Sequence, residues 1–266
     1  MRAPSNLWVP KMLAVGGYGG NIPFVLKTSE LYSQSNGTWS ASGSMNVPRT
    51  DFASVLLDNG QVLVAGGAID NNGGCTNTAE VYDPTSGTWT LTGSMTDLRE
   101  AFRMVVLLDG SVLVMGGYNN VKGALRSTEI YNITTGLWNA TSDYVIATFA
   151  YEMVRLPNGL VLAYGSFDSS VYWNLAALYD PSNGVWSPTA SLAPERGYFQ
   201  LKLLQDDTVL ACGAGGKIDN FNRNPPLGTK SADVYDVASG TWSATGPMLN
   251  TTYGRYNHQM LLLSGL

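Results

Sequence analysis

Residues 62–67 read Val-Leu-Val-Ala-Gly-Gly, and this pattern returns about every 50 residues along a chain of 266 residues. The other copies are Leu13-Ala14-Val15-Gly16-Gly17, Val112-Leu113-Val114-Met115-Gly116-Gly117, Val161-Leu162-Ala163-Tyr164-Gly165 and Val209-Leu210-Ala211-Cys212-Gly213. A fixed period of this length indicates a repeat architecture. The recurring residues therefore belong to the scaffold, and functional residues are to be sought among those that do not recur.

Each copy continues in the same way. A variable loop follows the Gly pair, and then come a short segment ending in Tyr, a polar turn with Gly, and Trp. The Tyr and Trp copies are Tyr32, Tyr82, Tyr131, Tyr179 and Tyr235, and Trp39, Trp89, Trp138, Trp186 and Trp242. In four copies an Arg and an apolar run then follow, and these are Arg49, Arg99, Arg196 and Arg255.

The local composition of each repeat predicts four short β-strands. The runs are rich in Val, Leu, Tyr and Trp, which suit a pleated, half-buried surface. Asp58-Asn59-Gly60 and Asp109-Gly110 are hairpin signals, and we expect positive φ at both central turn positions. No helical periodicity is sustained. Four-stranded antiparallel sheets with two apolar faces bury both faces by packing around an axis, as in a β-propeller.

Taken together, the Gly pair, Glu-x-Tyr, Trp and Met-x-x-x-Arg resemble the kelch repeat, over five copies and essentially the whole chain. The resemblance implies strands A to D from the inside outward, with the Gly pair ending strand B, Tyr on C and Trp on D. We therefore predict a single all-β domain over 1–266, a five-bladed β-propeller of four-stranded antiparallel blades. The expected blades are blade 1 (1–40 plus 253–266), blade 2 (49–90), blade 3 (99–139), blade 4 (147–187) and blade 5 (196–243).

The two ends of the sequence carry complementary parts of one repeat. Residues 7–17 form a B-type strand without an A strand before it, and residues 255–263 have the A-strand pattern. We expect the C-terminal strand to complete the first blade, which leaves no unpaired inner edge. The same strand could instead complete a neighbouring molecule and build a head-to-tail chain. Closure within one chain is favoured by its higher effective concentration; the sequence being a fragment of a larger protein is the remaining alternative.

Composition excludes some classes of function. The net charge is −5 and 13% of the residues are charged, without the basic stripe of a nucleic-acid-binding protein. The apolar runs are too short for a membrane span. Abundant Ser, Thr, Asn and Gly with little Lys favour an extracellular or secreted glycoprotein, with a cytoplasmic location as the alternative. Candidate glycosylation sites are Asn36, Asn132, Asn139 and Asn250, each in an Asn-x-Thr sequon.

The inventory of catalytic residues is small. The single histidine, His258, aligns with Phe52, Phe102 and Phe199, so we interpret it as a packing residue. Galactose oxidase, a copper-radical enzyme with a kelch-like propeller, uses two His ligands, which this chain does not contain. A lone His also argues against a His-rich metal site, and the sequence has no Gly-x-Ser-x-Gly motif. We expect no catalytic residue, metal or cofactor.

Two groups of residues are candidates for ligand binding. The first is the Arg set, whose planar guanidinium groups suit carboxylates; in some kelch proteins such arginines bind acidic peptides. Its structural alternative is bonding to inter-blade carbonyls or to the repeating Glu30, Glu80 and Glu129. The fourth repeat lacks both partners, with Ala147-Thr148 near the Arg position and Ala177 in place of Glu.

The second group lies in the variable loops after the Gly pairs, where binding residues concentrate on rigid scaffolds. It comprises Tyr18, Tyr118, Phe167, Tyr172, Trp173 and Phe221. Aromatic side chains among Asn and Asp suit sugar stacking or peptide contact. We predict a non-enzymatic module that binds a protein or glycan, or self-associates into an extracellular homo-oligomer or filament. The alternative is a kelch-related sugar oxidase or isomerase without the copper-radical site.

Overall fold

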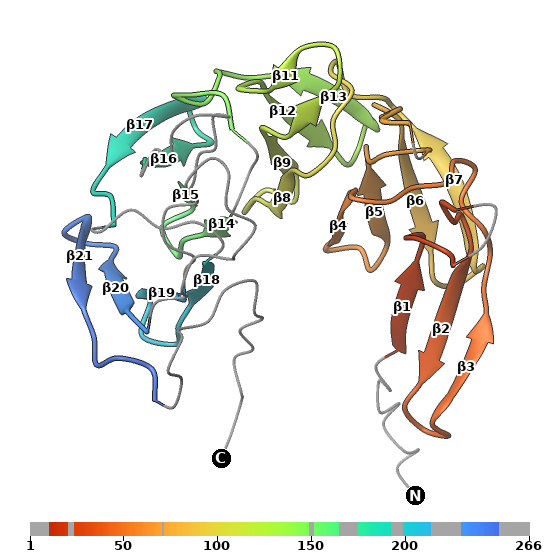
Figure 1. The fold of residues 1–266 in the computed structure, drawn as a ribbon, viewed down its shortest axis with the longest axis horizontal. Coiled ribbons are helices and arrows are strands. Elements are labelled where there is room, and N and C mark those ends of the chain that lie inside the picture. Colours follow the sequence, from red (N-terminus) through yellow and green to blue (C-terminus); the bar gives the residue numbers. More distant parts are fainter. Residues whose placement is uncertain are drawn as a thin grey trace, which may run out of the picture. The chain divides into compact units, whose positions relative to one another are not determined.

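The protein is all-β, and its strands form antiparallel sheets (Figure 1). The computed structural model describes residues 11–20, 24–70, 72–148, 152–164, 175–192, 199–213 and 230–249. Every regular element within these ranges is a strand. Backbone contacts divide the chain into two compact units, residues 1–100 and 101–266. The single domain that the sequence suggested stays a prediction.

The first unit contains two sheets whose strands follow sequence order. The first sheet consists of β1 (Lys11–Val15), β2 (Ser29–Ser33) and β3 (Thr38–Ala41). The second consists of β4 (Ala53–Leu56), β5 (Val62–Ala65), β6 (Ala79–Asp83) and β7 (Thr88–Thr92). The expected fourth strand of the first sheet, within 253–266, lies outside the described residues.

The second unit contains three four-stranded sheets and one hairpin. The sheets are β8 (Arg103–Val106), β9 (Val112–Met115), β12 (Thr128–Asn132) and β13 (Leu137–Ala140); β14 (Glu152–Arg155), β15 (Val161–Tyr164), β16 (Ala176–Asp180) and β17 (Val185–Thr189); and β18 (Gln200–Leu203), β19 (Val209–Cys212), β20 (Ala232–Asp236) and β21 (Thr241–Ala244). The hairpin of β10 (Tyr118–Asn119) and β11 (Gly123–Ala124) was not predicted; it occupies the loop after the third Gly pair. We call β4, β8, β14 and β18 the leading strands, because each begins its sheet.

The expected positions of the recurring residues are confirmed. The Gly pairs that the structure describes follow β1, β5 and β9. Tyr82 on β6 lies directly opposite Trp89 on β7, with ring centroids 5.0 Å apart. The same Tyr–Trp pairing joins the last two strands of every other four-stranded sheet, and β2 and β3 of the first sheet. Because cross-strand aromatic pairs are a main source of sheet stability, these residues are scaffold.

The Gly pair permits close backbone approaches, both within a repeat and toward the next one. The Gly67 N–H donates to the Arg99 carbonyl oxygen at 2.8 Å. A Cβ on Gly67 would lie 2.6 Å from the carbonyl oxygen of Thr50 and 2.8 Å from Cβ of Phe52, and its φ is +97°. An L side chain is disfavoured on both counts.

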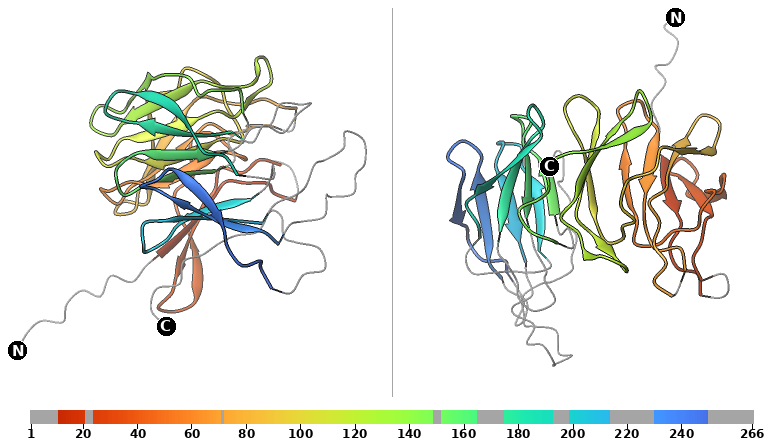
Figure 2. Two further views of the ribbon diagram at one scale, coloured as in Figure 1. Left: turned by 90° about the vertical axis from the view of Figure 1, so that its left-hand side faces the viewer. Right: turned by 90° about the horizontal axis from the view of Figure 1, so that it is seen from above.

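In three repeats, neighbouring sheets are also joined by a hydroxyl three residues after the Trp, a feature that was not predicted. This hydroxyl bonds the Tyr hydroxyl of the following repeat over 2.7 to 2.8 Å. The pairs are Ser42 with Tyr82, Thr141 with Tyr179, and Thr189 with Tyr235. Apolar residues pack around these contacts, for example Met45 against Val64 and Trp89. Figure 2 shows the sheets from two further sides.

The expected turn geometry at Asp58-Asn59-Gly60 is wrong. Among these residues only Gly60 has positive φ, at +85°. The Leu57 N–H donates to the Gln61 carbonyl oxygen, and the Gly60 N–H to that of Leu57. This is a three-residue loop that ends in a Gly with left-handed backbone conformation. Such a loop matches the twist of the two strands with one left-handed residue, whereas the expected two-residue turn needs two.

Replacing Ala101 by Gly is expected to stabilise the protein by about 1 kcal/mol. Ala101 has φ of +52° at an exposed position just before β8, and a Cβ there is strained in the left-handed region. Urea denaturation measures the change. Ala140→Gly, on the exposed strand β13, is the matched control and should destabilise. Equal destabilisation by both changes would contradict the account.

Candidate functional site

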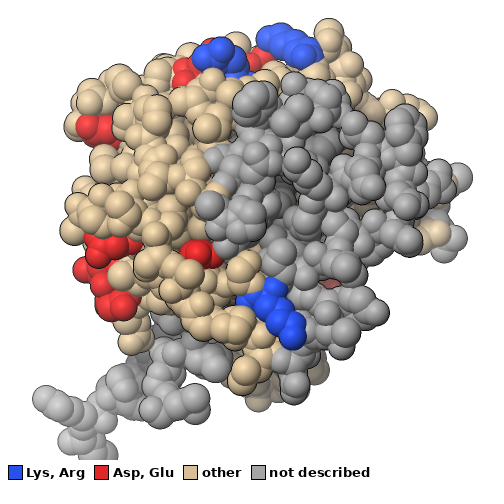
Figure 3. All heavy atoms as spheres, turned by 60° about the vertical axis from the view of Figure 1, so that its left-hand side comes forward, with Lys and Arg blue, Asp and Glu red and all other residues tan. Residues whose placement is uncertain are grey.

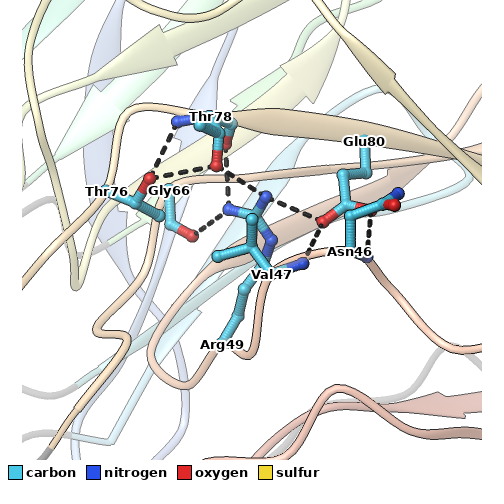
Figure 4. A network of polar contacts seen from close by, with 7 residues as sticks. All are labelled: Asn46, Val47, Arg49, Gly66, Thr76, Thr78 and Glu80. Carbon is cyan, nitrogen blue, oxygen red and sulfur yellow. Dashed lines mark hydrogen bonds and ion pairs between the residues drawn. The ribbon is translucent and has the colours of Figure 1, made fainter.

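The recurring Arg is part of a buried polar network (Figure 4). Arg49 Nη1 donates to the carbonyl oxygens of Gly66 at 2.8 Å and Thr78 at 2.9 Å. Its Nη2 donates to Thr78 Oγ1 at 2.8 Å and to Glu80 Oε1 at 3.0 Å. Both members of the Arg49–Glu80 ion pair are fully buried. The network therefore ties the start of β4 to β5 and β6.

Glu80 in turn holds the loop that comes before β4. Its carboxylate accepts the Asn46 N–H at 2.7 Å, the Asn46 side-chain amide at 2.8 Å and the Val47 N–H at 3.0 Å. Burial by itself would raise the pKa of Glu80, but these bonds and the Arg49 guanidinium outweigh burial and hold the pKa below its usual value. Glu80 is therefore ionised and paired at neutral pH.

At the start of the fourth repeat, uncharged residues occupy the positions that correspond to the Arg–Glu pair. The Gly117 N–H donates to the Thr148 carbonyl oxygen at 2.8 Å, as the Gly67 N–H does to Arg99, so Thr148 stands where other repeats have Arg. Ala177 replaces Glu, and Tyr144 occupies the place of Met45. All three side chains are buried, and Tyr144 packs edge-to-face on Trp186 at 4.9 Å.

A second polar group lies on the leading strands of the second unit. Arg103, Glu152 and Gln200 each occupy the first position of their strand, and we call them the leading-strand row. Strand β14 lies between β8 and β18 (Figure 1). The equivalent residue of β4 is Ala53, which opposes Ala65 as Arg103 opposes Met115. The row is therefore a feature of these three repeats and does not belong to the common scaffold.

Contacts within the row are long. Arg103 Nη2 lies 3.9 Å from Glu152 Oε1, and Gln200 Nε2 lies 3.4 Å from the same oxygen. The Arg103 side chain is 48% exposed and that of Glu152 is 16% exposed. Lys202 lies two residues after Gln200 on β18, and therefore on the same strand face. The row thus ends in a half-exposed guanidinium with weak internal pairing.

The carboxyl group of Glu152 is poorly compensated. Burial raises its pKa to about 7, although Arg103, the Leu201 N–H and Lys202 act in the opposite direction. Near neutral pH this carboxyl group is therefore about half protonated, while Arg103 and Lys202 keep the surroundings positive. Perturbed acids that lie among charged groups are enriched at functional sites.

Comparison with known families bears on the repeats themselves. Residues 49–96 and 105–143 match the model of the Kelch motif. The chain contains kelch repeats. The matched segments cover strands β4 to β7 and β9 to β13, in which the Gly pairs and Tyr–Trp pairs lie. No curated protein matches the chain.

Two members of the Arg set lie within the described residues. Arg49 and Arg99 are fully buried, so neither guanidinium is accessible to a ligand in this structure. Arg49 bonds to backbone carbonyl oxygens and to Glu80. These are the contacts expected if the recurring Arg has a structural role. Arg196 and Arg255 lie outside the described residues.

The loop aromatics of the kelch repeats are only partly described. Tyr18 is 62% exposed and pairs with Val25 across the β1–β2 loop. Tyr118 begins the β10–β11 hairpin and is half-buried. The other members of this group lie outside the described residues; they are Phe167, Tyr172, Trp173 and Phe221.

Three sequons lie on exposed backbone. Asn36 is in the turn between β2 and β3, Asn132 is the last residue of β12, and Asn139 is on β13. Asn36 Oδ1 accepts from Thr38 N–H and Oγ1, and Asn132 Oδ1 accepts from the N–H groups of Thr134 and Thr135. Asn250 and His258 lie outside the described residues.

The described part of the chain was also compared with the requirements of a metal site and of a membrane span. Those residues contain no group of three or more His, Cys, Asp or Glu that could hold a metal ion. They also form no helix long and apolar enough to cross a membrane. On the face drawn in Figure 3, charged side chains are scattered among uncharged ones.

The leading-strand row was missed because its members lie in segments that read as apolar core runs. Arg103 follows Phe102, and Gln200 follows Phe199, at a place where the second repeat has Ala53. An alignment of the repeats by their Gly pairs would have shown three successive polar residues at one otherwise small, apolar position. Polar residues that depart from the repeat pattern at one position indicate a role other than stabilising the scaffold.

Replacing Glu152 by Gln is expected to stabilise the folded state at pH 8 and to change little at pH 4. The folded-state pKa of this acid is raised, so its burial costs no stability while it is protonated and costs progressively more as the pH rises. Urea denaturation at both pH values measures the difference. A loss of stability at pH 8 would show that the ionised carboxylate is structurally required.

Proposed function

We propose that the protein is a non-enzymatic binding module that engages a protein ligand at the leading-strand row. The observation that carries this proposal is the row itself. Three neighbouring strands present Arg103, Glu152 and Gln200 at one level, and the second repeat has Ala53 there. A scaffold role does not require these side chains.

The row lies at the same end of the sheets as the variable loops. Arg103 opposes Met115, the residue directly before the third Gly pair, and Gln200 opposes Cys212, the residue before Gly213. Loops leaving the sheets after these residues therefore begin beside the row. This is the usual arrangement of a binding face on a rigid scaffold, and kelch propellers commonly bind proteins.

A peptide-display library, a glycan array and turnover assays with sugar substrates test the proposal together. Wild-type protein is expected to select peptides, and Arg103→Gln is expected to weaken their binding at least tenfold. Arg126→Gln removes the same charge from a side chain that is 57% exposed and lies outside the row, so it is the matched control. Sugar turnover, or glycan binding without peptide binding, would contradict the proposal.

We further propose an extracellular location, with glycans on Asn36 and Asn132. The exposed positions of both residues support this, because the hydrogen bonds of these side chains use Oδ1 and leave Nδ2, the atom that carries a glycan, pointing to no described partner. Mass spectrometry after deglycosylation of the native protein tests it. Unmodified Asn at both positions in the native protein would contradict it.

We also propose that the protein has five blades, and that residues 253–266 complete the first blade. Within the described residues β1 pairs only with β2, and Met12 is 65% exposed. Trp39 is 53% exposed, whereas Trp89 is 8% exposed. Glu30 has the repeat position of Glu80, for which Arg255 would be the partner. Light scattering should give a monomer of 28.5 kDa; head-to-tail polymers would instead support strand exchange between copies.

A further inference from the structure

We propose that the leading-strand row binds a carboxylate of the protein ligand between Arg103 and Lys202, beside the carboxyl group of Glu152. This rests on the proposed function and names the chemical group that the site would take. The bound group is an acidic side chain or a chain terminus.

The charges in and beside the row are the first support. Arg103 from β8 and Lys202 from β18 are the cations that act on Glu152 of β14. On β15, Tyr164 opposes Glu152, and its hydroxyl accepts the Leu192 N–H at 2.8 Å. The one acid thus stands between two cations, and a site with a net positive charge in a protein of net charge −5 favours an anionic group.

The geometry of Arg103 is the second support. Nη1 donates to the Phe102 carbonyl oxygen at 3.2 Å, while Nη2 is 3.9 Å from the nearest carboxylate oxygen of Glu152. That second distance is too long for a hydrogen bond. A half-exposed guanidinium is therefore held at one nitrogen by the backbone, and its other nitrogen is not closed into a tight ion pair. A ligand carboxylate can approach this nitrogen.

Glu152 determines how this site depends on pH. An ionised Glu152 would repel a second carboxylate, whereas its neutral form donates one hydrogen bond to it. Binding therefore takes up one proton whenever Glu152 begins ionised. Because the pKa of Glu152 is about 7, its protonated fraction falls about tenfold between pH 6 and pH 8. The affinity is expected to fall by the same factor.

The test uses N-acetyl-aspartate methylamide, whose carboxylate stays ionised across this pH range. NMR titration at pH 6 and pH 8 measures its dissociation constant with the full chain. We expect binding about tenfold tighter at pH 6. Glu152→Gln should bind about equally at both pH values, because its amide N–H donates at either pH. Arg103→Gln and Lys202→Gln should bind at least tenfold more weakly at both, and Arg126→Gln should behave as wild type.

Two further probes separate the outcomes. N-acetyl-asparagine methylamide, the neutral analogue, and inorganic sulfate are titrated in the same way. Equal binding of the neutral analogue, tighter binding of sulfate, or a pH dependence that survives Glu152→Gln would overturn the carboxylate assignment. If displayed peptides without acidic residues still require Arg103, this inference fails while the proposed protein-binding function stands. If no peptide binds, both fail.

Discussion

Replacing Glu80 by Ala is expected to lower the free energy of unfolding by about 3–5 kcal/mol, the usual cost of breaking one side of a buried ion pair. The change leaves the Arg49 guanidinium buried without its counter-charge and removes the acceptor for the N–H groups of Asn46 and Val47. Urea denaturation at pH 7, followed by tryptophan fluorescence, measures it. Asp143→Ala, in an ion pair whose side chains are 57% and 51% exposed, is the control and should cost less than about 1 kcal/mol.

The double change Arg49→Thr with Glu80→Ala should cost less than the sum of the single changes. The fourth repeat already carries Thr148 and Ala177 at these positions, so a sheet of this type folds without the pair. The double-mutant cycle gives the coupling energy directly. Additive costs would show that Arg49 and Glu80 act independently, which the bond between them does not allow.

The contribution of Glu80 to the free energy of unfolding should also depend on pH. Its pKa is lowered in the folded state, so the stabilisation is present above the unfolded-state pKa and is lost as the pH falls through the folded-state value. The difference in unfolding free energy between wild type and Glu80→Ala should therefore shrink on acidification. A difference that stays constant down to strongly acidic pH would contradict a role for the ionised carboxylate.

Replacing Gly67 by Ala is expected to cost about 3 kcal/mol or more. Its Cβ would meet the backbone of Thr50 at 2.6 Å, and the chain cannot move away without losing the bond from Gly67 N–H to the Arg99 carbonyl oxygen. Gly60→Ala is the matched control, because Gly60 also has positive φ, at +85°, but a Cβ at that position would meet no atom within 4 Å. Its cost should be smaller, about 1–2 kcal/mol.

Denaturation of the two Gly variants separates steric overlap from backbone strain. Equal costs for Gly67→Ala and Gly60→Ala would mean that φ alone decides the cost, and that the close approach of Gly67 to Thr50 does not matter. A larger cost for Gly67→Ala identifies the close approach of Gly67 to Thr50 and Phe52, within one repeat, as a steric requirement of the fold.

The scaffold was predictable because its causes are local and repeated. Tyr82 opposite Trp89, and Gly67 at the end of β5, follow from spacing that recurs in each copy. The turn at Gly60 was assigned the wrong geometry because an Asn-Gly dipeptide fits two hairpin types, and the three-residue loop is visible only from its hydrogen bonds.

The candidate site was not predictable from motifs, for a physical reason. Arg103, Glu152 and Gln200 come from strands about 50 residues apart and meet only when neighbouring sheets pack. The recurring Arg was a candidate for ligand binding because of its repetition in the sequence. In the structure, Arg49 is buried by its contacts within the scaffold, and these structural contacts account for the repetition. Likewise, Tyr144 was not recognised in the place of Met45, because no Met-to-Arg spacing survives in that repeat.

Hydrogen–deuterium exchange with and without a display-selected peptide tests the central claim most directly, that the site lies on the leading strands and the recurring residues are scaffold. Slower exchange is predicted in the peptides that contain the starts of β8, β14 and β18, and this protection should be absent in Arg103→Gln. Protection confined to the fourth strands of the sheets, β7, β13, β17 and β21, would contradict the account.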